Sequence, residues 1–206
     1  MPFTSYSGFV NEILSWSDVS LTTAQVTSII GVAERDVNEV LRVRTMETAL
    51  ATTANTAGAA ALPADYVELK QAYINSSPVI RPLKRATADE IYHKYPDRTA
   101  DSLAEVLVAR EGSNFIFGPC AQVGDVMTGI YYARPISMAD NTTITSTFSS
   151  YPQVYLFAAL SRLEPFIGRD PRIQTWESYY NRALSEANGQ DARELASGGA
   201  LGAVVT

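Results

Sequence analysis

The sequence predicts an α+β protein: helices at both ends of the chain form one bundle, and a small antiparallel β module is inserted between them. Three observations predict this class. Apolar residues recur every three or four positions near both ends, as in amphipathic helices. Short β-forming runs separated by turn residues fill the middle of the chain. Strands and helices do not alternate, which argues against a doubly wound sheet.

Residues 1–46 are expected to supply the N-terminal helices of the bundle. Thr22 or Thr23 is well placed to cap the second of them. Apolar side chains then follow the three/four spacing from Val26 to Leu41, which indicates a strongly amphipathic helix of about five turns.

Residues 47–148 are expected to form the inserted β module. Pro82 would confine the strand in which it lies to a sheet edge. Thr87 and Glu90 form a capping box, which predicts a short helix that stops at Pro96. The three β-forming segments 105–111, 114–119 and 126–135 are separated by short turns and predict an antiparallel meander. Residues 143–148 are expected to form a short strand or an extended lead-in. A turn and then a strand are expected over 62–74, with the strand from Tyr66 to Ile74, and further strands are expected at 79–86, 105–111, 114–119 and 126–135.

Residues 149–189 are expected to form the C-terminal helix pair of the bundle. The first helix is predicted over 151–166, and the second begins at Asp170 and Pro171 and ends near Asn188. The remaining segment, 190–206, is rich in Gly and Ala and is predicted to be a flexible, extended tail.

Composition argues against several classes of protein. The chain has 16 basic and 22 acidic residues, a net charge of −6, so it lacks the basic footprint of a protein that grips nucleic acid. Cys120 is the only cysteine, so no intramolecular disulfide forms. The most apolar stretch, 150–163, is interrupted by polar residues and is shorter than the ~20 residues of a bilayer span. The N-terminus does not resemble a signal peptide.

No constellation of residues points to an enzyme. His93 is the only histidine, and neither Cys120 nor any serine lies in a nucleophile context. Pairs of carboxylates are expected by chance among 22 acids, and neither metal-ligand spacing nor a glycine-rich phosphate loop is present. We therefore assign no catalytic, cofactor-binding or metal-binding residue.

Two sets of side chains are candidates for contacts between subunits. The densest basic group lies on the strand with Pro82 and is either a solvated edge or a docking surface for an acidic partner. Three tyrosines of the C-terminal helices exceed what one bundle is expected to hide, and tyrosine is typical of interfaces. The candidates are Arg81, Lys84, Arg85, Tyr151, Tyr155 and Tyr179.

Three stretches resemble the head-to-tail adaptor (connector) proteins of tailed bacteriophages. They are LPADYVELKQAYIN from Leu62, GIYYARP from Gly129, and the helix pair YPQVYLFAALSRLEPFIGRDPRIQTWESYYNRALSEAN from Tyr151. They occur in the family's order, and the resemblance covers about residues 62–190. The resemblance is specific because all three stretches occur together, whereas one stretch alone would be weak evidence for the family.

The resemblance implies a structural virion protein that assembles in the host cytoplasm and acts at the capsid vertex. Such adaptors form rings, commonly of twelve copies, beneath the portal protein. The ring extends the DNA channel, through which DNA passes without specific binding, and offers a platform to tail, nozzle or neck proteins. The C-terminal extension typically reaches the portal, which makes the apolar tail residues candidates for that contact: Leu195, Leu201, Ala203, Val204 and Val205.

Two other readings stay open on the sequence. The protein is alternatively another head-completion or neck component, one level further from the capsid. A less favoured alternative is an enzyme or small-ligand protein with a pocket beside the β module, around Asp125 or His93.

Overall fold

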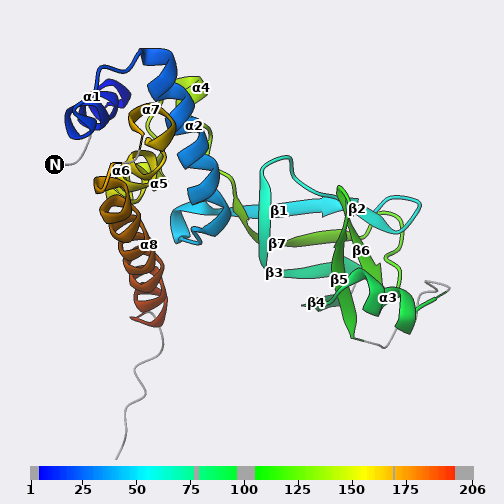
Figure 1. Cartoon of the computed structure of the whole chain (residues 1–206). Helices are drawn as coiled ribbons and strands as arrows, with labels where there is room; N and C mark the ends of the chain where they lie inside the picture. Colours follow the sequence, from blue (N-terminus) through cyan, green and yellow to red (C-terminus); the bar gives the residue numbers. More distant parts are fainter. Residues whose placement is uncertain (1–4, 77–78, 97–104, 169, 198–206) are drawn as a thin grey trace, which may run out of the picture. The chain divides into compact units, whose positions relative to one another are not determined.

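Figure 1 shows the computed structural model, which describes residues 5–76, 79–96, 105–168 and 170–197. The chain divides into two compact units, a helical unit (1–46 and 135–206) and a β unit (Glu47–Arg134). The predicted α+β class is confirmed, as is a bundle that combines helices from both ends of the chain. The β unit ends at Arg134 and not at residue 148, because the segment that follows is helical.

The N-terminal half of the helical unit consists of α1 (Tyr6–Ser17), α2 (Thr23–Val40) and the short 3₁₀ helix η1 (Arg44–Met46). Thr22 caps α2 through a capping box: its hydroxyl accepts from the backbone N–H of Gln25, and its own N–H donates to the Gln25 side chain at 2.8 Å. One stripe of α2 is buried, as the apolar spacing predicted: Val26, Ile29, Ile30, Ala33 and Val37.

The apolar stretch 150–163 forms the centre of the bundle. Helix α6 (Pro152–Ser161) packs against α2 and α8, and six of its residues are buried around its circumference. The predicted single helix over 151–166 is wrong, because the chain breaks after Ser161 and resumes as α7 (Glu164–Ile167). Pro165 explains the break, since its ring would clash with the carbonyl of Ser161 in a continuous helix.

The last helix, α8 (Arg172–Ser197), is longer than predicted. Trp176, Ala183 and Ala187 form its buried stripe and keep the three/four spacing. The expected end near Asn188 is wrong, because residues 190–197, predicted as part of the extended tail, continue the helix. Gly189 costs about 1 kcal/mol in a helix, and the Gln, Ala, Arg, Glu and Leu that follow are strong helix formers.

A short strand or an extended lead-in was expected at 143–148. Thr145 is extended there, but the segment continues as the helix α5 (Ser146–Ser150), and a further short helix, α4 (Met138–Asn141), precedes it. Thr145 caps α5 by accepting from the N–H of Phe148 at 3.2 Å, a local bond that competes with an extended conformation. The buried carboxylate of Glu34, 5% exposed, accepts from the N–H of Met138 at 2.7 Å. Burial raises the pKa of Glu34 above its ordinary value, against the hydrogen bonds that lower it.

The β unit contains one seven-stranded sheet, in the order β1-β7-β3-β4-β5-β6-β2. A bridge between Ala54 and Ala60 brings the β1 and β2 sides together, so the sheet curls toward closure (Figure 1). Its strands are β1 (Glu47–Thr53), β2 (Ala59–Ala61), β3 (Tyr66–Ser76), β4 (Val79–Arg85), β5 (Val106–Glu111), β6 (Asn114–Gly118) and β7 (Val126–Ala133). Its main core includes Leu50, Leu69, Ile74, Val108, Phe115, Phe117 and Met127.

The expected meander of the last three strands is wrong in one respect. β5 and β6 form an antiparallel hairpin, but β7 inserts between β1 and β3. Gly129 of β7 lies against the backbone of Gln71 and Ala72, where a Cβ would collide, so this glycine permits the close approach of β3. A second difference is that β4 and β5 run parallel.

Helix α3 (Ala88–Lys94) covers β5 and β6 and begins where the capping box predicted. Thr87 accepts from the N–H of Glu90 at 3.2 Å, and Ile91 is buried against the strands. His93 is exposed on this helix. No helix within the described ranges is long and apolar enough to span a bilayer.

Candidate functional site: a tyrosine–arginine recess in the β unit

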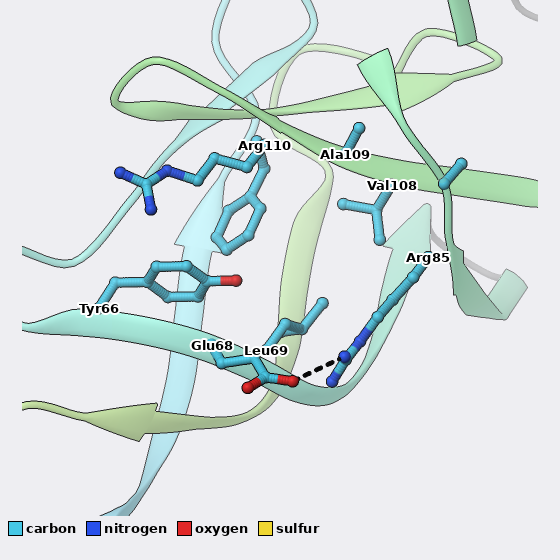
Figure 2. A pocket seen from close by; sticks show the side chains of 9 residues that line it. Tyr66, Glu68, Leu69, Arg85, Val108, Ala109 and Arg110 are labelled. Carbon is cyan, nitrogen blue, oxygen red and sulfur yellow. Dashed lines mark hydrogen bonds and ion pairs between the residues drawn. The ribbon is translucent and has the colours of Figure 1, made fainter. Parts of the chain in front are cut away.

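A recess opens where β4 changes partners. The β3–β4 ladder runs from the hairpin as far as Tyr73 opposite Pro82, and from Leu83 onward β4 pairs with β5 instead. Pro82 has no N–H to donate, so it suits the point of the switch. Pro82 was expected to confine its strand to a sheet edge. That expectation is wrong for β4 as a whole, which lies between β3 and β5, although up to Pro82 the strand pairs with β3 alone. Beyond the switch β3 and β4 no longer pair, and a cavity of about 110 Å³ lies there, lined by residues of β3, β4, β5 and β6 (Figure 2).

The recess has an apolar floor and a polar rim. Leu69, Val108 and Phe115 of the floor are at most 5% exposed. The rim is supplied by Tyr66, Glu68, Arg85 and Arg110, from three different strands. β3 also carries register irregularities between Tyr66 and Glu68 and between Leu69 and Gln71, and such bulges redirect side chains.

Arg85 crosses the split between β3 and β4. Its Nη1 donates to the carboxylate of Glu68 at 3.0 Å and its Nη2 to the backbone carbonyl of Lys70 at 3.4 Å (Figure 2). The Arg85 side chain thus supplies a donor to the Lys70 carbonyl, at a point where β4 no longer pairs with β3. Because both side chains are about half exposed, at 52% and 43%, the ion pair itself contributes little to stability.

Tyr66 forms one wall of the recess, and its hydroxyl points inward (Figure 2). Its ring contacts Phe115 edge-on, with centroids 5.3 Å apart, and stacks on Tyr131 at 5.9 Å. The guanidinium carbon of Arg110 lies 5.9 Å from the Tyr66 centroid. Burial raises the pKa of the Tyr66 phenol, against the opposite effects of a hydrogen bond with the Leu69 backbone and of the nearby Arg85 and Arg110.

The two sequence motifs of the β unit meet behind Tyr66. Asp65, from LPADY, accepts from the hydroxyl of Tyr131, from GIYYARP, at 2.9 Å. The backbone carbonyl of Asp65 also accepts from the N–H of Arg134 at 2.7 Å. These bonds fix the start of β3 against the end of β7 and thereby the position of the Tyr66 ring.

The third motif has its own anchor in the helical unit. Arg172 pairs with Asp170 at 2.7 Å and donates to the carbonyls of Trp16 and Ser17 at 3.4 and 3.2 Å. Its guanidinium carbon lies 5.3 Å from the Trp176 ring. The hydrogen bonds of Arg172 lower the pKa of Asp170. This group joins the end of α1, where carbonyls lack helical partners, to the start of α8.

The structure separates the predicted basic contact residues. Only Arg85 lines the recess. Lys84 faces elsewhere, where it pairs with Glu105 at 3.4 Å, and Arg81 is half-buried on the earlier part of β4. The sequence analysis did not identify Tyr66, Glu68 and Arg110 as site residues. They come together only where β4 separates from β3, and no sequence motif or hydrophobic period indicates that separation.

The predicted aromatic contact residues also differ from one another. Tyr155 is 2% exposed, with its hydroxyl 3.5 Å from the side-chain oxygen of Asn38, so its assignment to a subunit interface is corrected to the core. Tyr151 is half-buried at the start of α6. Tyr179 is 46% exposed, with its ring 5.2 Å from that of Phe157.

The predicted portal contacts lie almost entirely beyond the described residues. Leu195 belongs to the backbone of α8. Leu201, Ala203, Val204 and Val205 fall outside the described ranges.

Comparison with known families accounts for the three motifs together. The family model described as SU10 adaptor protein matches residues 4–202, nearly the whole chain. This match defines a structural phage protein of the virion, an adaptor that interacts with other head and tail proteins. The chain belongs to the SU10 adaptor protein family, which confirms the resemblance to head-to-tail adaptors. No curated protein matches the chain.

Proposed function

We propose that this adaptor forms a ring, of twelve copies, beneath the portal protein at the capsid vertex. The ring extends the DNA channel and offers an attachment platform to tail, nozzle or neck proteins. The observation that carries the proposal is the family match over residues 4–202. The net charge of −6 supports it, because a channel wall with few cations would not retain the phosphates of passing DNA.

The C-terminal segment is our candidate for the portal contact. Helix α8 carries the chain to Ser197, and the apolar residues beyond it suit strand addition or groove filling on a portal subunit. A truncation after Ser197 tests this contact better than one after Asn188, which would remove part of α8. The shortened protein should keep its helical circular dichroism and fail to join portal rings.

Electron microscopy of the protein mixed with portal rings provides the readout. A second ring stacked on the portal is expected with the full chain and should be missing with the truncated one. Replacement of both Val204 and Val205 by Ser provides a milder variant of unchanged length. Undiminished stacking of the truncated chain would refute the anchor. If the full chain binds only after another protein has joined the portal, it is a neck component further from the capsid.

A further inference from the structure

We propose that the recess around Tyr66 binds a glutamate or aspartate side chain presented by another head or tail protein. The proposal is separate from the ring and from the portal contact of the tail. It rests on the charge, the size and the donor groups of the recess.

The charge of the rim is unbalanced by one positive unit. Arg85 and Arg110 supply two cations and Glu68 one anion, and Glu68 already engages Arg85. The Nε of Arg110 donates to the carbonyl of Gly112 at 3.2 Å and its guanidinium carbon lies 5.9 Å from the Tyr66 centroid, but within the described part of the chain Arg110 forms no ion pair. One added carboxylate would therefore neutralise the rim and take a charge-assisted hydrogen bond.

The size and lining of the recess suit a single acidic side chain. The recess has a volume of about 110 Å³. The buried floor of Leu69, Val108 and Phe115 can cover methylene groups, while the Tyr66 hydroxyl offers a neutral donor at the centre (Figure 2). An apolar stem with a charged end matches this arrangement.

A protein carboxylate fits better than a DNA phosphate. A nucleic acid brings a row of negative charges, and its binding depends on many cations along its path. This chain is acidic overall, so a polyanion would be repelled at long range more strongly than one carboxylate on a protein segment. An adaptor family also implies protein neighbours in the virion, which supply such segments.

Titration of the full chain with the peptide acetyl-Ala-Glu-Ala-amide tests the proposal, with nuclear magnetic resonance of Tyr66 and Val108 as readout. We expect saturable shifts at these residues, and binding about tenfold weaker for the Gln counterpart of the peptide. Arg110→Gln and Tyr66→Phe should each weaken binding about 2- to 10-fold, the range of one hydrogen bond. Lys84→Gln removes the same charge one residue from Arg85 but outside the recess, and should leave binding unchanged.

Three results would overturn the proposal. The first is equal affinity for the Glu and Gln peptides, and the second is the absence of saturable shifts at the recess. The third is a short oligothymidylate that shifts the same resonances at lower concentration than the Glu peptide, which would make the site a phosphate site. Chemical shifts of Phe117, in the core of the same unit, report whether each variant remains folded.

Discussion

The hydroxyl of Tyr131 donates a 2.9 Å hydrogen bond to the carboxylate of Asp65, 66 positions earlier in the chain. The bond joins the turn before β3 to the end of β7, and Tyr131 also stacks on Tyr66. Two of the motifs by which the sequence resembles phage adaptors, LPADY and GIYYARP, are therefore in direct contact in the folded protein.

Tyr131→Phe should lower the free energy of unfolding by about 1–2 kcal/mol, because it leaves the Asp65 carboxylate without a donor and the ring in place. Urea denaturation measures the change. Tyr73→Phe, on the same sheet but 40% exposed, serves as control and should stay within about 0.5 kcal/mol of the wild type. Equal losses for both variants would mean that the Asp65 bond is unimportant.

The same bond predicts a response to alkaline pH. Burial, together with the bond to Asp65, raises the pKa of Tyr131 from 10.0 to about 12. A group whose folded pKa is raised stabilises the fold fully below its unfolded pKa, and this contribution is lost as the pH rises through the folded value. The stability difference between wild type and Tyr131→Phe should be constant at neutral pH and shrink between pH 10 and 12. A difference that persists unchanged above this range would contradict the assignment.

Trp176→Ala should destabilise the helical unit by about 3–5 kcal/mol, because the indole is 4% exposed and its removal leaves a cavity. Thermal unfolding followed by circular dichroism measures the loss. Trp16→Ala is the matched control, since Trp16 is 40% exposed, and it should cost less than half as much. Near-wild-type melting of Trp176→Ala would place this residue against a neighbouring subunit instead.

Glu34→Ala should cost about 1–3 kcal/mol, since it removes the acceptor of buried donors at the start of α4. Hydrogen exchange at the amide of Met138 should accelerate. Glu39→Ala, exposed on the same helix, should change neither quantity appreciably. Unchanged protection of Met138 in Glu34→Ala would show that the carboxylate does not hold α4.

Local signals in the sequence predict local structure well. Thr87 caps α3 where its spacing to Glu90 indicated, and Thr22, one of the two threonines expected there, caps α2; such caps are complete within four residues. Trp176 lies in the core, as the spacing of its apolar neighbours predicted. Helix ends were predicted less well, since propensity alone extends α8 past Gly189.

Local sequence patterns did not predict which distant strands pair with one another. Nothing in the run of residues that forms β7 shows that it pairs with β1 and β3 and not with β6, and the β3 pairing depends on contacts such as Gly129 against Ala72. The recess depends on the partner switch of β4, so only Arg85 was identified in advance, on its charge alone. Tyr155 was misassigned because a tyrosine in a helix buried on all sides has the same spacing as one at an interface.

The insertion of the β unit into the helical unit has a consequence for synthesis. Helices α1 and α2 are made first, yet partners such as Arg162, which pairs with Asp36 at 2.7 Å, follow 126 residues later. A ribosome adding ~5–20 residues per second needs several seconds to cover that distance. During that interval the apolar stripe of α2 lacks the helices α4 and α6 that pack against it, while the whole β unit, Glu47–Arg134, is synthesised. We therefore expect the apolar stripe of α2 to be the part of the nascent chain that most needs protection from non-native contacts.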